Sequence, residues 1–429
     1  MLRSEGFEFR ASNSMFARRT GWVLEKNALT REVESRREKG LPVIDLTESN
    51  PTRCGFRYDS AAILQALANP AALVYQPEPR GPLRARQAVS EYYAGRGLAL
   101  DPEQLFLTSS TSEAYSFLFR LLADPGDSVL VPQPSYPLFD FLTGLNDLET
   151  IPYPLLYNSG WKIDLDALSA RLEAADRTFH LPRAIVVVHP NNPTGSYVRD
   201  DELAVLADLC GRHDLALIAD EVFADYDLGI SQPSSRAELD SVLTFTLSGL
   251  SKIAALPQMK LAWIVVSGPE SARADAMARL EIIADTYLPV SAPVAVALPD
   301  LLGTRHAIQA QIMTRVKQNL AELDRQLDAS SRVTRLWVEG GWYGVLELAP
   351  AGPERSGPSQ RSGAPSKSGP ADEELASSLV REGGVLVHPG HFYEFTSDDF
   401  LVLSLIPPAD VFSEGIGKLL ARLDRFAIK

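Results

Sequence analysis

Cysteine and histidine are scarce in this chain of 429 residues, which contains two of the first and six of the second. Cys54 and Cys210 are too few for a disulfide framework or a cysteine-rich zinc site. The histidines show no metal-ligand spacing, so the sequence predicts no metal site. A reduced compartment, with the cytoplasm as default, is therefore expected.

Long apolar runs are also missing. The longest, such as Ala184–Val188, are far shorter than the roughly 20 residues that a membrane helix needs. The first ten residues are too polar for the core of a signal peptide. Lys and Arg number 41 against 55 Asp and Glu, which gives a net charge of −14. Such a chain has no overall attraction for nucleic acid or anionic membrane, and we expect neither as a partner.

Short apolar runs alternate with helical patterns between about residues 105 and 268. Most runs are apolar on consecutive residues, as is typical of strands buried on both faces of a sheet. The alternation predicts an α/β domain with a largely parallel sheet sandwiched by helices. The expected strands are Leu105–Thr108, Ser128–Val131, Ala184–His189, Leu215–Asp220, Val242–Leu247 and Leu261–Val266.

The last third of the chain has a different pattern. A long helical pattern at Arg305–Leu327 is followed by strand-like Val333–Val338 and Gly344–Leu348, and later by a helical stretch at Ala371–Glu382. Between them, Ala351–Pro370 consists mostly of Gly, Pro and Ser, and we expect a flexible insertion because it cannot bury enough apolar surface to order itself. The sequence thus predicts a large domain over residues 56–310 and a smaller α/β domain built from residues 1–55 and 311–429.

Four polar motifs each follow a predicted strand, at the sheet edge where open parallel sheets bind ligands. In the first, Ser110 and Glu113 have capping-box spacing at a helix N-terminus. Such a terminus suits a phosphate, although an ordinary helix cap explains this motif alone. The second is the turn Asn-Asn-Pro-Thr-Gly around Asn192, which forms with or without a function.

The other two motifs place charged side chains at the ends of buried strands. Burying the charged carboxylate of Asp220 there costs free energy unless the carboxylate is paired. It either caps the following turn or faces a cationic ligand atom. Lys252 ends the stretch Ser-Gly-Leu-Ser-Lys. Most lysines are surface charges, but a lysine after a buried strand can have a lowered pKa and form a Schiff base.

Taken together and in this order, the four motifs resemble the class I/II aminotransferases, which are fold-type-I enzymes dependent on pyridoxal 5′-phosphate (PLP). The resemblance covers roughly residues 42–406. It implies a PLP-dependent aminotransferase that moves an amino group between an amino acid and a 2-oxo acid by a ping-pong Schiff-base mechanism on Lys252. It also implies a homodimer with shared active sites.

The resemblance assigns roles to individual residues. Lys252 and Asp220 would be catalytic, since Lys252 would form the Schiff base and Asp220 would keep the pyridine nitrogen protonated. Asn192 would hydrogen-bond the phenolic oxygen of the cofactor ring. Tyr136 would stack on the ring, and Tyr75 would reach the phosphate of the neighbouring subunit. The residues that would hold the phosphate are Ser110, Thr111, Ser112, Ser251 and Lys260.

Two departures from the family pattern concern the cofactor. Phe223 stands where a tyrosine is usual, so one donor to the phenolic oxygen is lost. Lys260 stands where an arginine is usual, which keeps the charge but gives up the bidentate geometry. Trp342, in a Gly-Gly-aromatic turn, either packs near the substrate or belongs to the core.

Two further departures concern the substrate. Val402 stands where the family has the arginine that binds the substrate carboxylate, and a valine cannot pair with a carboxylate. The family's Gly-Asn-Pro appears as Ser-Asn-Pro. The residues considered for substrate binding, each of which also has a purely structural explanation, are Ser49, Asn50, Arg53, His388 and His391.

Other functions remain open. The same cofactor site would also serve β-elimination, as in a C–S lyase, racemisation or decarboxylation, and no motif separates these reactions. A PLP-binding regulator with a degenerate enzyme domain is disfavoured, because only about forty residues precede the match and the chain is acidic.

Overall fold

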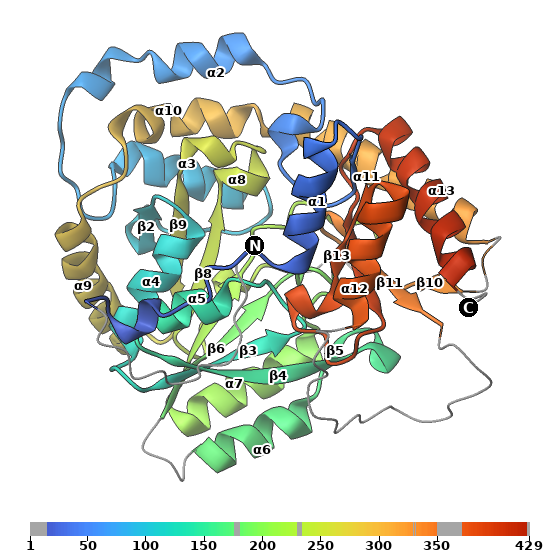
Figure 1. Ribbon diagram of the computed structural model, residues 1–429. Coiled ribbons are helices and arrows are strands. Elements are labelled where there is room, and N and C mark those ends of the chain that lie inside the picture. The colour runs from blue at the N-terminus through green and yellow to red at the C-terminus, as the bar shows by residue number, and fades with distance from the viewer. Residues whose placement is uncertain are drawn as a thin grey trace.

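A large and a small sheet organise the part of the chain that the computed structural model describes, residues 15–175, 181–229, 234–328, 330, 332–349 and 371–426 (Figure 1). The large sheet has eight strands in the order β2-β9-β8-β7-β6-β3-β4-β5, and the small sheet has four in the order β10-β11-β14-β13. A further pair, β1 and β12, lies beside the small sheet. The predicted insertion, residues 351–370, lies outside the described residues.

The large sheet is mostly parallel, as predicted. β3, β4, β6, β7 and β8 run parallel to one another, whereas β9 is antiparallel to both β8 and β2, and β5 is antiparallel to β4. All six predicted strands are present, with ends that differ by up to two residues. The strands are β2 (Leu105–Thr108), β3 (Ser128–Gln133), β4 (Glu149–Leu156), β5 (Lys162–Ile163), β6 (Pro182–Val188), β7 (Ala216–Asp220), β8 (Thr244–Gly249) and β9 (Ala262–Ser267).

Helices cover both faces of the large sheet. Val129 and Val131 belong to one buried cluster with residues of α4 and α9, whereas Leu130 belongs to another with residues of α6 and α7. Figure 1 shows α6 and α7 together on one side of the sheet. Successive strand residues point to opposite faces, so burial on both faces explains the continuous apolar runs. These helices are α4 (Thr111–Leu122), α6 (Leu165–Ala175), α7 (Asp200–His213) and α9 (Glu270–Tyr287).

The remaining helices around the large sheet lie over its β2 edge or in the connections between its strands. α3 and α10 pack together over the β2–β9 edge, within a cluster that includes Leu107 and Trp263. The bounds are α2 (Ser60–Leu67), α3 (Leu83–Ala94), α5 (Phe139–Leu145), α8 (Leu250–Ile253) and α10 (Ala292–Gly303).

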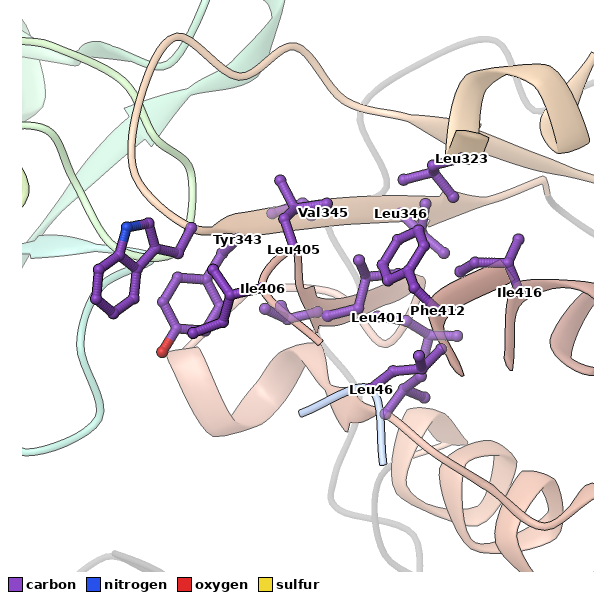
Figure 2. Packing of buried hydrophobic residues seen from close by; sticks show 14 of the residues in the cluster. Leu46, Leu323, Tyr343, Val345, Leu346, Leu401, Leu405, Ile406, Phe412 and Ile416 are labelled. Carbon is purple, nitrogen blue, oxygen red and sulfur yellow. The ribbon is translucent and has the colours of Figure 1, made fainter. Parts of the chain in front are cut away.

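The small sheet is antiparallel and packs against α11 and α13 through the aliphatic cluster shown in Figure 2. Leu46, next to β1, joins this cluster, so a segment early in the sequence completes a core formed mainly by the last third of the chain. The elements are α1 (Ala28–Glu38), β1 (Ile44–Asp45), α11 (Arg305–Leu327), β10 (Val333–Arg335), β11 (Tyr343–Leu348), α12 (Ala371–Ser378), β12 (Val385–Leu386), β13 (His388–Pro389), β14 (Phe400–Ser404) and α13 (Ala409–Phe426).

Local bounds in this half differ from the predicted ones. The strand expected at 333–338 ends at Arg335, and the helix expected at 371–382 ends at Ser378 and continues as a wider helical turn, Leu379–Gly383. The helix α11 has the predicted ends and runs across residue 310, where we placed the domain boundary. The domain division itself stays a prediction. Within the described ranges, no helix has the length and apolar character needed to cross a bilayer.

Candidate active site

The predicted reactive residues meet at one edge of the large sheet. Asp220 is the last residue of β7, and Lys252 lies in α8, directly after β8. In the β7–β8 register Asp220 pairs with Leu247, so the two strands end side by side. Asn192 lies in the loop that follows β6. In the same loop, His189 donates its backbone N–H to the carbonyl oxygen of Asp220 at 2.8 Å. Parallel strands present their carboxyl ends at one edge, and this topology brings the three side chains together.

The residues predicted to hold a phosphate lie along the same edge. Thr108 at the end of β2 pairs with Ala262 at the start of β9, so Ser110 and Lys260 extend from neighbouring strands. Ser110 caps α4, since its hydroxyl accepts the Glu113 backbone N–H at 3.1 Å, and the predicted helix cap is confirmed. The unpaired N–H groups of the first turn of α4 therefore face this edge together with Thr111 and Ser112.

Aromatic rings surround the Lys252 side chain. Its Nζ lies 5.2 Å from the ring centroid of Phe223 and 5.0 Å from that of Trp342, and these two rings are 5.2 Å apart. Burial lowers the pKa of Lys252 to about 8, although the charge of Asp220 acts in the opposite direction. An amine with a lowered pKa is partly neutral near physiological pH, which makes it a better nucleophile.

Asp220 is a buried carboxylate with two donors. It accepts the Tyr115 hydroxyl at 3.1 Å and the Val222 backbone N–H at 3.1 Å. Burial raises the pKa of Asp220 to about 6, whereas these hydrogen bonds and the charge of Lys252 lower it. Asp220 is therefore mostly ionised at neutral pH. The sequence did not single out Tyr115, because it lies within the apolar pattern of α4, and only the fold brings it to Asp220.

Asn192 carries a buried amide oxygen that has no hydrogen-bond partner among the described residues. Its loop packs tightly through Gly195, which has a φ of +69° and whose added Cβ would lie 2.4 Å from the Gly340 carbonyl oxygen. A buried polar atom without a partner is costly in a folded protein, so its presence points to a ligand. A flip of the amide exchanges its oxygen and nitrogen, so Asn192 can present an N–H donor at this position. The amide donor, the buried anion and the amine of lowered pKa together match the phenolic oxygen, ring nitrogen and aldehyde of PLP.

Two predicted contacts lie in loops beyond the large sheet. Tyr136, in the loop between β3 and α5, is 41% exposed, but partial burial and the charges of Tyr343 and Asp220 raise its pKa to about 12. It therefore lies near the site. Tyr75, by contrast, is 67% exposed on the loop between α2 and α3.

The residues considered for binding the substrate carboxylate lie in different environments. The Arg53 side chain is 74% exposed and lies 3.9 Å from the Glu48 carboxylate. His391 lies in the short helix η9 (Gly390–Tyr393), where its Nδ1 is 2.8 Å from Asp372 Oδ1. Val402, in the middle of β14, is fully buried in the small-domain cluster.

Two further candidates lie close to tyrosines. Burial lowers the pKa of His388 to about 4, and its Nδ1 is 3.0 Å from the Tyr393 hydroxyl. Ser49 hydrogen-bonds Tyr343, while Asn50 caps the short helix that follows it by accepting the Thr52 backbone N–H at 3.1 Å. The sequence patterns around both tyrosines were noted, but their aromatic side chains were not predicted as site residues.

A carboxyl pair adjoins the site and provides a pH-dependent prediction. Burial raises the pKa of Glu394, next to η9, to about 7, and the nearby carboxylate of Asp140 on α5 adds to the rise. A folded-state pKa above the ordinary value means that this group stabilises the fold at low pH and that the stabilisation is lost as pH rises through 7. We expect the unfolding midpoint of the wild type to fall more steeply than that of Glu394→Gln between about pH 5 and 8. Parallel curves for the two proteins would contradict this assignment.

The comparisons with known proteins agree with this geometry. The glutamate-pyruvate aminotransferase of Haemophilus influenzae is 25% identical over 386 residues, which cover 89% of this chain and 91% of the relative. The alanine aminotransferase of Mycobacterium tuberculosis is 27% identical over 401 residues, covering 91% and 86%. The solved alanine aminotransferase of Pyrococcus furiosus has the same fold, with a TM-score of 0.79 at 21% identity, covering 97% of this chain and all of that one. Residues 42–409 match the family model described as aminotransferase class I and II. The chain therefore belongs to the class I and II aminotransferases, a family of enzymes that generally use PLP.

Proposed function

We propose that this enzyme moves an amino group between an amino acid and a 2-oxo acid by a ping-pong route in which Lys252 forms a Schiff base with PLP. The observation that carries the proposal is the placement of Lys252, with its pKa lowered to about 8, beside the buried carboxylate of Asp220. The names of the relatives make alanine, glutamate and pyruvate the first substrates to examine.

Each side chain has a distinct part in this chemistry. When bound, PLP supplies an electron sink next to the donor's α-carbon. Lys252 would hold the cofactor, and its free Nζ would take the donor's α-proton and return it. Asp220 would hold the proton on the ring nitrogen through a charge-assisted hydrogen bond, worth roughly 1.5–3 kcal/mol. Asn192 would donate an amide N–H to the ring's phenolic oxygen.

The phosphate would bind at the N-terminus of α4. The Ser110 hydroxyl still has its proton to donate, because it acts as an acceptor in the helix cap. Thr111, Ser112 and Ser251 add hydroxyl donors at the same edge, and Lys260 adds a positive charge. Helix N-termini bind phosphates through their free N–H groups and dipole.

We also propose that a second copy of the chain covers the loop around Tyr75. Leu73, Val74 and Tyr75 are 89%, 60% and 67% exposed. Three consecutive large apolar residues in water are typical of an interaction surface. A homodimer would bury them and would bring Tyr75 to the partner's site, so sedimentation should give twice the mass of one chain. A monomer at working concentration would contradict this proposal.

The experiment that tests the proposed function is an absorbance spectrum of the purified protein with added PLP, followed by a panel of amino acids. A yellow band that bleaches with one amino acid and returns with a 2-oxo acid would establish transamination and identify the donor. Pyruvate or ammonia released without return of the band would instead indicate β-elimination. A protein that shows no band would contradict the assignment of Lys252.

A further inference from the structure

Two tyrosines from the small-sheet side of the molecule lie close to the aromatic rings that pack against Lys252. The Tyr343 ring centroid lies 6.2 Å from that of Phe223, the ring that packs against the Lys252 amine. Tyr393, in η9, lies 6.4 Å from Tyr343 by ring centroids. In Figure 2 the Tyr343 ring lies at one end of the hydrophobic cluster, with its hydroxyl directed away from the aliphatic side chains.

The backbone fixes Tyr393 in this position. Its carbonyl accepts the Ser135 backbone N–H at 3.0 Å, and Ser135 lies in the loop that follows β3 of the large sheet. Tyr393 therefore comes from the small-sheet side but is hydrogen-bonded to the loop that carries Tyr136. Tyr343 adjoins both Phe223 and Tyr393 through its ring.

Each phenol hydroxyl has one polar side chain as a neighbour, and we assign that side chain as the donor. Burial raises the pKa of Tyr343, a hydrogen bond with the Ser49 side chain opposes this rise, and we assign the Ser49 hydroxyl as its donor. His388 is neutral at physiological pH, since burial lowers its pKa to about 4, and we assign its Nδ1 proton to the 3.0 Å contact with Tyr393. With both oxygens accepting, the two hydroxyl protons stay free to donate to a ligand.

The positive charges nearby have other partners. Arg53 lies at the surface beside Glu48, and the His391 ring pairs with the buried Asp372. The Arg315 guanidinium lies 3.4 Å from the backbone carbonyl oxygens of Cys54 and Ile406. It also lies over the ring of Phe56. Among the described residues, the neutral donors near the rings around Lys252 therefore include the two phenols and the Trp342 indole N–H, and only the two phenols form a neighbouring pair.

We propose that the hydroxyls of Tyr343 and Tyr393 bind the carboxyl group of the amino donor, an assignment that rests on the proposed transamination at Lys252. Tyr343 and Tyr393 are then specificity-determining residues. Ser49 and His388 are positioning residues, because they hold the phenol oxygens and leave their protons to the substrate.

This anchor defines a class of substrates. A guanidinium would favour a carboxylate strongly, because the bond between them is charge-assisted on both sides. A phenol hydroxyl donates to a carboxylate and to a neutral carbonyl oxygen with more similar strength, and it gains no full ion pair from the negative charge. The donor site should therefore accept amino acids and also their neutral carboxamides.

Three ligands that differ only in this group test the proposal. 2-Methylalanine has no α-proton, so it binds without being deprotonated; its carboxamide is neutral, and isopropylamine lacks the group. Dissociation constants are measured from the change in cofactor absorbance of the PLP-loaded enzyme. Tyr343→Phe and Tyr393→Phe should each raise the dissociation constants of the first two ligands about tenfold and leave that of isopropylamine within about twofold. Tyr287→Phe, at a half-exposed tyrosine on α9, is the matched control.

Other outcomes would overturn the proposal. Equal effects of the tyrosine variants on all three ligands would show a purely structural role. A wild-type preference for 2-methylalanine over its carboxamide of more than about 100-fold would show a fixed cation, and Arg53→Ala and Arg315→Gln would then identify it. A wild type without the cofactor band would overturn the proposed function and this subsite together, whereas a normal band with unchanged tyrosine variants overturns the subsite alone.

Discussion

Lys252→Ala should abolish transamination, with a loss of about 10⁴-fold or more in kcat/KM. On the proposed mechanism the variant would lose both the amine that holds the cofactor and the base that moves the α-proton, and no other lysine ends a strand at this edge of the described sheet. Steady-state kinetics with the amino donor found in the absorbance panel measure the loss. The spectrum of the same sample shows whether the protein still forms the yellow band.

The fold should tolerate this change. Burial lowers the pKa of Lys252 to about 8 from 10.5, so its contribution to stability falls as pH drops through 8. Removing it should therefore leave the cofactor-free protein at least as stable at neutral pH. Lys418→Ala, at an exposed residue of α13 that pairs with Glu414 at 2.7 Å, is the control and should retain wild-type kinetics. Wild-type turnover in Lys252→Ala would refute the Schiff-base assignment.

Asp220→Ala should lower kcat/KM by about two to four orders of magnitude. The ring nitrogen would then lose its anionic partner inside a buried site, where a positive charge is costly without one. Asp220→Asn should show nearly the same loss, because it keeps the shape and removes the charge. A similar affinity for PLP in all three proteins would separate this electrostatic effect from loss of the cofactor.

The pH dependence of stability provides an independent measurement at Asp220. Burial raises its pKa to about 6 from 3.8, so the stabilisation that this group provides at low pH is lost as pH rises through 6. The unfolding midpoint of the cofactor-free wild type should therefore fall relative to Asp220→Asn between about pH 4 and 7. Asp275→Ala, at an exposed position of α9, should follow the wild type in both experiments. Full activity in Asp220→Ala would refute the role at the ring nitrogen.

Regular elements were predicted well where the local pattern and the tertiary environment agree. Leu105–Thr108 and the helix at Arg305–Leu327 have the predicted ends. The first is buried at every position because both faces of the sheet are covered, and the second keeps one apolar face over more than six turns. The strand expected at 333–338 ends at Arg335, although β11 continues to Tyr343 beyond the residues that pair with it.

The motifs that bring function to the large sheet were also visible in the sequence. Asp220, Lys252 and Ser110 each follow an apolar run, and a parallel sheet places the ends of such runs at one edge. The placement of Lys252 next to Asp220 follows from that rule once the strand order is known. The strand order itself, with antiparallel β9 between β2 and β8, comes from pairing between segments that are far apart in the chain.

Contacts across the two sheets could not be predicted in the same way. Tyr115 follows the helical pattern of α4, and Tyr343 and Tyr393 lie in stretches typical of a core, so nothing local distinguishes them from packing residues. Arg53 looked as plausible an anchor as His388, and only solvent exposure and the Glu48 contact separate them.

The sequence by itself determined the fold class, the family and the residues that end the strands, because these depend on local periodicity and on the order of motifs along the chain. The tertiary structure decided the environment of each reactive group. Burial lowers the pKa of Lys252 and raises that of Asp220, and Tyr343 and Tyr393, fifty residues apart in the chain, lie 6.4 Å apart by ring centroids. Desolvation and through-space contacts depend on which segments fold against each other, and no local pattern encodes them.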